Sequence, residues 1–348
     1  MPKLNNDIAL HYLQTFYNDT QIVKVERIQS LWSAYGEIAR YLIPSLSKSV
    51  IVKLVSPPAN TEHPRGWDGE VSHQRKLDSY INESIFYQQY SQHTNHFCRT
   101  PACYFSSNSD ASFIKAGKDA SFLIMEDLDQ AGFYKRCDEP SLKTIKLGVR
   151  WLAFFHAQFL SQPLPNVWPV GTYWHLKTRP NEFNNMPNSE LKRKAHTIDE
   201  VLNNAKYQTL LHGDAKLANF CFNADENDLA AVDFQYVGQG AGVKDLMYFM
   251  GSCLDDAGLH MHANDIVDEY FAKLREATQL YSVDANTSSA HKNKLNLDAL
   301  ENEWRELLPF AWADFERFLV GWASEHYKLN GFMSENTRNA LAKLPTVL

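Results

Sequence analysis

The chain has 348 residues, of which 44% are hydrophobic and 13% aromatic, enough for the core of one two-lobed enzyme or of two domains. Its formal net charge of −7 argues against a nucleic-acid-binding surface, which needs a basic patch. It has no run of about 18 apolar residues, no signal-peptide pattern at its start and five scattered cysteines, so we expect a cytoplasmic protein that does not enter a membrane.

The first part of the chain is rich in Val and Ile, which favours β-strands. In the third predicted strand, V-I-V-K-L-V, Lys53 lies between apolar neighbours. Taken alone, a lysine in this place either has a specific partner or extends its ammonium group into solvent from an edge strand. The predicted strands are residues 21–29, 37–43 and 49–55.

A polar segment with several Pro and Gly residues, 56–76, predicts a loop, and a helix follows it. In residues 77–90 the apolar and aromatic side chains recur at close to helical spacing. Glu83 lies within this predicted helix, in the run N-E-S-I-F-Y. Taken alone, Glu83 is either the partner of Lys53 or an ordinary solvated helix residue.

The following elements mark a change from strands to helices. Residues 120–128, A-S-F-L-I-M-E-D-L, predict a buried strand that ends in two acids. From about residue 140 the pattern turns helical, and we expect the aromatic residues within 147–157 to pack in a core. Residues 257–348 are also mostly helical by pattern, without repeats or low-complexity tracts.

The most informative segment runs from residue 210 to residue 235. His212, Asp214, Lys216 and Asn219 follow the pattern H-x-D-x-K-x-x-N, and an apolar strand then ends in D-F at Asp233. Phosphoryl transfer has a loose transition state, so a protein mainly positions groups and neutralises charge. One carboxylate must orient the attacking hydroxyl and accept its proton. The position of Asp214 in the pattern fits this role. Two oxygen ligands must hold Mg²⁺ against the triphosphate, and Asn219 and Asp233 fit.

This pattern resembles the catalytic loop and metal-binding strand of the protein-kinase-like fold. It is most similar to small-molecule kinases of the aminoglycoside phosphotransferase, choline kinase and ecdysteroid-kinase-like group, and E-D-L, V-D-F-Q and D-L-M-Y-F favour the last branch. The resemblance implies an α+β, bilobal fold. A smaller lobe with an antiparallel sheet would span residues 1–128, and a larger, mainly helical lobe residues 129–348. ATP and Mg²⁺ would bind between them.

The resemblance also implies the nucleotide contacts. Lys53 matches the kinase lysine that contacts the α- and β-phosphates, and Glu83 matches the glutamate that pairs with it. Glu126 and Leu128 lie where the chain enters the interlobe hinge, near 126–132, and where backbone groups hydrogen-bond the adenine. The phosphate-covering loop is the weak match, because residues 30–37 hold a single glycine. Its candidate contacts are Gly36 and the hydroxyl groups of Ser30 and Ser33.

Three residues of the catalytic region need separate interpretation. Lys216 stands where Ser/Thr protein kinases carry a lysine and many small-molecule kinases an aromatic residue or histidine, and a cation there neutralises the γ-phosphate. We expect His212 to pack and hydrogen-bond behind the loop. Asp245 opens a helix in D-L-M-Y-F. It is either a family aspartate that braces the catalytic loop or a first-turn acid favoured by the helix dipole, and the sequence leaves both open.

The resemblance places the acceptor between the segment before the catalytic loop and the C-terminal helices. We predict a small-molecule alcohol as the partner, no nucleic acid, and leave the oligomeric state open. Aromatic rings in these segments either contact the acceptor or pack in the core. A cationic acceptor would be attracted to the face of such a ring. Asp255 and Asp256 either attract a cationic acceptor or are solvated. The aromatic and histidine positions are Trp168, Tyr173, Trp174, His175, Trp304, Phe310, Trp312, Phe315 and Trp322.

Two other functions stay open. The first is a catalytically silent nucleotide-binding module that acts by interaction, although a silent kinase usually lacks one of the residues kept here at 53, 214, 219 and 233. The second is a protein kinase, which Lys216 favours. Asp245 follows Asp233 by only 12 positions, however, which leaves little room for a peptide-docking loop.

Two further motifs are weak leads. The run G-x-G-x-G at 238–242 follows a strand, as a dinucleotide site does, but it lacks the final glycine at the required offset. The spacing of His93, His96, Cys98 and Cys103 matches no common zinc module. Neither a P-loop nor a G-x-S-x-G elbow occurs.

Overall fold

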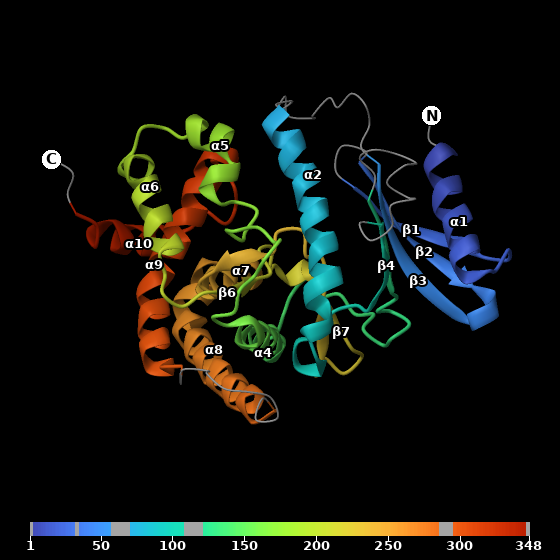
Figure 1. The fold of residues 1–348 in the computed structure, drawn as a ribbon. Coiled ribbons are helices and arrows are strands. Elements are labelled where there is room, and N and C mark those ends of the chain that lie inside the picture. Colours follow the sequence, from blue (N-terminus) through green and yellow to red (C-terminus); the bar gives the residue numbers. More distant parts are fainter. Residues whose placement is uncertain (1–2, 32–34, 57–69, 108–120, 285–294, 346–348) are drawn as a thin grey trace.

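The computed structural model describes residues 3–31, 35–56, 70–107, 121–284 and 295–345. They form a sheet-based N-terminal part and a larger, mainly helical C-terminal part, and helix α2 runs between the two in Figure 1. The α+β class and the arrangement in two lobes, predicted from the sequence, are therefore confirmed.

The N-terminal sheet has five antiparallel strands in the order β1-β2-β3-β5-β4. The three strands predicted at its start are present, each with bounds within two residues of the prediction. The strand predicted at 120–128 is also present but shorter. The strands are β1 (Val23–Ser30), β2 (Gly36–Ile43), β3 (Lys48–Val55), β4 (Cys103–Ser106) and β5 (Ser121–Glu126).

Successive side chains of a strand point to opposite faces of the sheet, and in β3 this decides where Lys53 lies. Val52 and Leu54 pack in one apolar cluster with Leu13 of α1 (Lys3–Tyr17), which covers that face. Lys53 therefore points to the other face, where α2 lies.

Helix α2 spans Glu70–Ile85 and continues through a π-helical turn at Phe86–Tyr90. The predicted helix is confirmed, but it begins earlier than expected, so the loop prediction is wrong for residues 70–76. The last glycine or proline before the helix is Gly69, and nothing after it interrupts helical hydrogen bonding. Residues 57–69 lie outside the described part of the chain.

The C-terminal part is built from long helices and two small antiparallel sheets, β6 with β9 and β7 with β8. The helices predicted from residue 140, after residue 243 and beyond residue 257 are confirmed. Its elements are α4 (Leu142–Phe159), α5 (Pro180–Asn185), α6 (Glu190–Asn203), β6 (Thr209–Leu211), β7 (Phe220–Phe222), β8 (Leu229–Ala231), β9 (Gly238–Gly240), α7 (Val243–Cys253), α8 (Asp256–Asp284), α9 (Leu297–Trp322) and α10 (Gly331–Ala342).

For several aromatic residues the sequence left open whether they contact the acceptor or pack in the core. Most of them lie in the core. Trp174, Trp304 and Trp312 are fully buried, while Trp322 at the end of α9 is half-buried. A tryptophan buries a large apolar area, so these rings stabilise the packing of α7 and α9. This burial leaves only a few rings near the catalytic loop for contact with a ligand.

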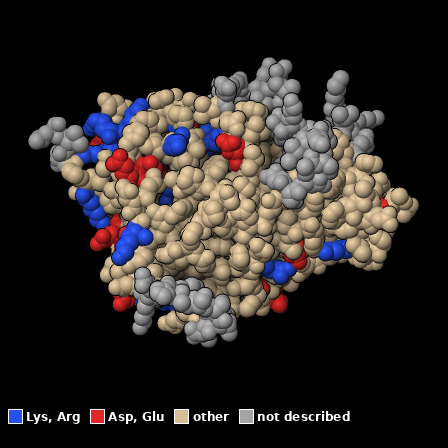
Figure 2. Space-filling model, in the orientation of Figure 1, with Lys and Arg blue, Asp and Glu red and all other residues tan. Residues whose placement is uncertain are grey.

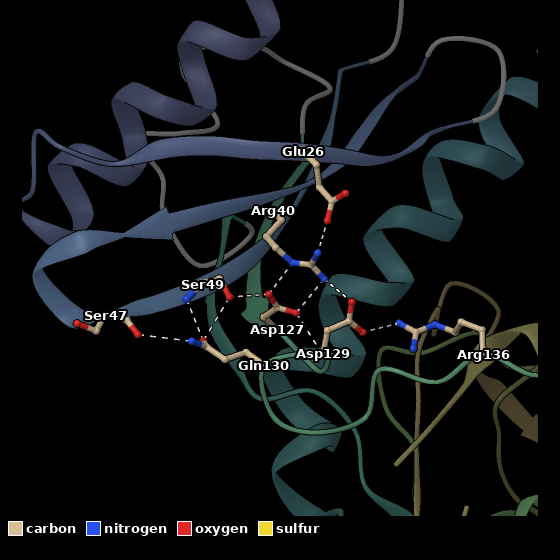
Figure 3. A network of polar contacts seen from close by, with 8 residues as sticks. All are labelled: Glu26, Arg40, Ser47, Ser49, Asp127, Asp129, Gln130 and Arg136. Atoms are coloured by element: carbon tan, nitrogen blue, oxygen red, sulfur yellow. Dashed lines mark hydrogen bonds and ion pairs between the residues drawn. The ribbon is translucent and has the colours of Figure 1, made fainter. Parts of the chain in front are cut away.

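The connection from β5 to the C-terminal part is fixed by charges (Figure 3). Asp127, which is buried, accepts a hydrogen bond from Arg40 Nε at 2.6 Å and one from Ser49 Oγ at 2.6 Å. Arg40 also pairs with Glu26 and Asp129. Burial opposes the charge of Asp127, but Arg40 and Ser49 outweigh it and lower the pKa of Asp127. The first residues of this connection are thereby held against β2 and β3.

The surface in Figure 2 carries Lys and Arg interspersed with Asp and Glu, mostly toward the edges of the face shown. No large patch of one sign covers that face. Among the described residues, no helix has the length and apolar character needed to cross a bilayer.

Candidate active site

An ion pair between the two parts of the chain marks one side of the site. Lys53 Nζ lies 2.6 Å from Glu83 Oε2 and 3.7 Å from Asp233 Oδ1. Lys53 and Glu83 are both only 2% exposed, so neither is a solvated surface residue. Burial opposes the charge of Lys53, but Glu83 and Asp233 together raise its pKa. The ammonium group therefore stays charged at neutral pH.

Two residues that the sequence reasoning did not single out hold α2 against the segment that carries Asp233. The Asn82 amide donates to the carbonyl oxygens of Gln235 at 3.1 Å and Val237 at 2.7 Å. Gln235 Nε2 donates to Asp233 Oδ1 at 2.7 Å, and Lys76 Nζ donates to Gln235 Oε1 at 2.9 Å. Asn82 precedes Glu83 and Gln235 ends V-D-F-Q, so both stood within the quoted motifs. Their role depends on contacts between distant segments.

The catalytic loop follows β6 through a tight turn at Gly213. Gly213 has φ +78°, and a Cβ atom there would lie 1.9 Å from the Tyr236 carbonyl oxygen. Only glycine fits this conformation and this approach. The turn brings Asp214 close to the segment after Asp233.

Asp245 braces this turn from the first turn of α7. Its Oδ2 accepts the backbone N–H of His212 at 2.6 Å, and its Oδ1 accepts that of Gly213 at 3.0 Å. The same carboxylate lies 3.1 Å from His156 Nε2 and has no exposed surface. Of the two interpretations that the sequence left open for Asp245, the structure supports the bracing one.

His212 lies behind the loop, as predicted. It is fully buried, and its Nε2 lies 3.0 Å from the Val232 carbonyl oxygen, while its Nδ1 accepts the Asp214 N–H at 3.3 Å. Burial lowers its pKa, against the nearby acids, so the ring is neutral. His212 thus links the catalytic loop to the strand that carries Asp233.

Asp214 is buried, and two of its partners come from the same loop. Lys216 Nζ donates to Asp214 Oδ2 at 3.0 Å, and Asn219 Nδ2 donates to the same oxygen at 3.2 Å and to the Asp214 carbonyl at 2.8 Å. Since the Asn219 NH₂ group is used in this way, its carbonyl oxygen is the atom left to face a cation. The three side chains form one polar cluster on the catalytic loop.

The environments of the two acids move their pKa values apart. Burial raises the pKa of Asp214, although Lys216 opposes it. For Asp233 burial is outweighed by Lys53, Lys216 and Lys76, and its pKa is lowered. The Asp233 side chain is 32% exposed, against 7% for Asp214. Such a difference suits a proton acceptor at Asp214 and a permanently charged metal ligand at Asp233.

Asp233 also has an uncommon backbone conformation, with φ +70°. A non-glycine residue in this region is held by its surroundings, here by the bonds of Gln235 and Lys53 to its carboxylate. The structure thus brings together Lys53, Glu83, Asp214, Asn219 and Asp233 from separate segments. Lys216 joins them with its side chain 38% exposed.

The side chain of Glu126 does not point to this cluster. It accepts hydrogen bonds from Arg99 at 2.7 Å and the Ala102 N–H at 3.1 Å, and the Glu126 N–H donates to the Ala102 carbonyl at 2.8 Å. The Leu128 carbonyl accepts the Phe133 N–H at 2.8 Å. The Glu126 N–H and the Leu128 carbonyl are thus already paired, so neither of these atoms is left for an adenine ring.

The candidates for the phosphate-covering loop and the two acids proposed for the acceptor lie in other environments than this cluster. Ser30 ends β1 and Gly36 begins β2, while Ser33 lies outside the described residues. Asp255 and Asp256 accept the backbone N–H groups of Gly258 and Phe332, so both cap helix starts at the surface.

The two weak leads also have a structural explanation. Gly238–Gly240 form β9, paired with β6, and a Cβ atom at Gly238 would lie 2.6 Å from the Gly171 nitrogen. These glycines therefore permit close packing of backbones. Cys98 hydrogen-bonds Asn95, and Cys103 bonds the Phe105 carbonyl. In the described part of the chain, no three His, Cys, Asp or Glu side chains gather in a way that could hold a metal ion.

Comparison with known proteins adds a family. The model of the ecdysteroid kinase-like family matches residues 45–161 and 172–283, more than half of the chain. No curated protein matches the sequence.

Two solved structures are similar. A choline kinase from Cryptosporidium parvum Iowa II is 10% identical, with a TM-score of 0.51 over 97% of this chain and 95% of that one. An ethanolamine kinase from Plasmodium vivax is 10% identical, with a TM-score of 0.47 over 97% of this chain and 86% of that one. At this identity the choline kinase likeness shows the fold.

Proposed function

Because the chain belongs to the ecdysteroid kinase-like family, we propose that it is an ATP- and Mg²⁺-dependent phosphotransferase that moves the γ-phosphoryl group to a hydroxyl of a small molecule. The observation that carries this proposal is the convergence of Lys53, Glu83, Asp214, Asn219 and Asp233 described above. An ion pair, a buried carboxylate and two oxygen donors are the groups that phosphoryl transfer needs.

The nucleotide side of the site consists of Lys53 and the hinge. Lys53, oriented by Glu83, binds the α- and β-phosphates, and the Glu126 carbonyl and Leu128 N–H bind the adenine. The Asn219 carbonyl oxygen and the Asp233 carboxylate hold Mg²⁺, a small hard cation that takes few protein ligands and keeps several waters. Bound Mg²⁺ neutralises the phosphate oxygens. On this basis residues 1–128 form the nucleotide-binding lobe and residues 129–348 the catalytic lobe.

The acceptor side consists of Asp214 and Lys216. Asp214 accepts the proton of the attacking hydroxyl at Oδ1 or Oδ2, since its raised pKa makes it a better base than a solvated aspartate. Lys216 lies within hydrogen-bond distance of Asp214 and neutralises the charge that develops on the γ-phosphoryl oxygens. Most residues from Phe234 to Asp245 are buried, which supports a small acceptor rather than a docked peptide.

The proposal predicts a Mg²⁺-dependent gain in stability with ATP. At a hundredfold excess over Kd, ATP with Mg²⁺ should raise the unfolding free energy by about 2.7 kcal/mol. Asp233→Asn should remove the Mg²⁺-dependent part, because a neutral amide binds the ion weakly. Asp255→Asn, at an exposed acid, is the matched control and should behave as wild type. Equal thermal shifts in Asp233→Asn and wild type would contradict the metal role.

Lys216→Ala should lower kcat by about 10²-fold and change KM for ATP far less, because the lysine acts on charge that forms in the transition state. Lys216→Arg keeps the cation and should recover part of the rate. Steady-state kinetics at saturating acceptor separates the two parameters. A lower melting temperature with unchanged kcat would show that Lys216 has a purely structural role.

A further inference from the structure

Lys328 lies beside the proposed catalytic base, although it is distant in sequence and absent from every motif. It belongs to the segment between α9 and α10. Its Nζ lies 4.6 Å from the centre of the Tyr248 ring and 5.9 Å from that of Phe315. Tyr248 in turn hydrogen-bonds Asp214, and burial, followed by the nearby Tyr173 and Asp214, raises the pKa of Tyr248. Lys328 and Asp214 thus lie on either side of one tyrosine.

The Lys328 ammonium has no anionic partner of its own. Lys328 is only 8% exposed, yet among the described residues its Nζ has neither a carboxylate within ion-pair distance nor a hydrogen-bond acceptor. Among the other buried cations, Lys53 is paired with Glu83 and Arg317 with Asp314, whereas Lys244 of α7 also has no ion pair in the described part of the chain. Burial lowers the pKa of Lys328 to about 8, although Asp214 opposes this. Lys328, largely buried, without an ion pair and beside the proposed base, is therefore a candidate contact for an anionic group of a ligand.

The surroundings of Lys328 are mainly aromatic. The ring centre of Tyr173 lies 5.6 Å from Tyr248 and 5.4 Å from Phe318, and Tyr248 lies 5.1 Å from Phe315. Tyr248, Phe315 and Phe318 are at most 4% exposed and belong to the core, so the half-buried Tyr173 is the ring among these that can contact a carbon skeleton. A cationic amino alcohol bound here would meet the ammonium group of Lys328 and be repelled by it.

The acids at the surface do not change the local charge around Lys328. Asp255 and Asp256, the sequence's candidates for attracting a cation, are engaged at helix starts. Of the charged groups that act on Lys328, Asp214 raises its pKa and Lys216 lowers it. Asp214 is itself paired with Lys216, so the net local charge on the acceptor side is positive.

We propose that Lys328 binds an anionic group of the acceptor, so that the substrate is an alcohol that also carries a carboxylate or a sulfate. This inference rests on the proposed phosphotransferase function. The reacting hydroxyl lies at Asp214, the anion at Lys328, and the carbon skeleton against Tyr173. Lys328 is then a specificity residue that touches the substrate, without a part in proton transfer.

The test is a selectivity measurement with matched acceptors. ADP release is followed with ω-hydroxy carboxylates, hydroxyalkyl sulfates, the methyl esters of the same hydroxy acids, and amino alcohols of equal length. For wild type we expect kcat/KM to be at least about tenfold higher for the anionic members than for the esters, and lowest for the amino alcohols. Comparing carboxylates with sulfates identifies which anion fits.

Variants separate charge from packing. In Lys328→Met, which keeps the length and apolar stem, the preference for the anion over the ester should fall to near unity, mainly through KM. Lys328→Arg should retain part of it. Lys343→Met, at an exposed lysine at the end of α10, should leave the preference unchanged. Equal losses for acids and esters in Lys328→Met would overturn the inference, because they would place Lys328 in phosphoryl transfer or stability.

Two measurements distinguish a failure of this inference from a failure of the proposed phosphotransferase function. If ATP with Mg²⁺ gives no thermal shift in wild type, the phosphotransferase proposal itself fails. If that shift occurs but no hydroxy acid or hydroxyalkyl sulfate is turned over or further stabilises the ATP-bound protein, only the anionic acceptor is excluded. A stronger response to amino alcohols than to anions excludes it as well.

Discussion

Asp214→Asn is expected to lower kcat by about 10²- to 10⁴-fold, the usual contribution of a positioned general base. Asparagine has nearly the same shape and still accepts a hydrogen bond from Lys216, which lies 3.0 Å from Asp214 in the wild type. It cannot take the proton of the attacking hydroxyl. The measurement is kcat with saturating ATP, Mg²⁺ and acceptor.

Nucleotide binding should survive this change, because Lys53, Glu83 and Asp233 do not depend on the Asp214 charge for their ion pairs. The thermal shift with ATP and Mg²⁺ should therefore stay close to that of wild type. Asp255→Asn serves as the control acid. Turnover within a few-fold of wild type in Asp214→Asn would remove Asp214 as the base.

Asp245→Ala is expected to cost about 3–5 kcal/mol of unfolding free energy, the range for breaking a buried, fully bonded acid. The change leaves the N–H groups of His212 and Gly213 without their acceptor and removes the partner of His156. Each unsatisfied buried polar group costs about 1–3 kcal/mol. Chemical denaturation gives the difference directly.

A second first-turn acid provides the control for Asp245. Asp298 occupies the first turn of α9, and its side chain is 85% exposed in an ion pair with Arg275. Asp298→Ala should cost no more than about 1 kcal/mol, as exposed ion pairs do. If both substitutions had this small effect, Asp245 would be a plain helix-dipole acid and the bracing role would be wrong.

The fold was largely predictable from local patterns. The Val- and Ile-rich run predicted β3, and helical spacing placed Glu83 on α2, while the face on which Lys53 lies was left open. The spacing of Asp214, Lys216 and Asn219 identified one loop, since three residues within six positions of a turn have few arrangements. Boundaries were less certain: α2 begins at Glu70, inside the segment predicted as a loop.

Part of the hinge prediction could not come from the sequence. Two acids at the end of β5 looked equivalent, yet Glu126 bonds Arg99 on one side and Asp127 bonds Arg40 on the other (Figure 3). Neither partner is near in sequence. Only the paired sheet decides which atoms of Glu126 and Leu128 remain open to a ligand.

The sequence by itself predicted the candidate site: a base, two oxygen donors for a metal and a lysine with its glutamate, each carried by a short motif whose spacing reflects local geometry. The tertiary structure decided what surrounds them. Asp245 acquires its bracing role from packing of α7 against the loop, and Lys328 reaches Tyr248 from a segment more than a hundred residues beyond Asp214. Burial and charge pairing depend on contacts between distant segments, so no local pattern records that Lys328 is buried without a partner beside the base.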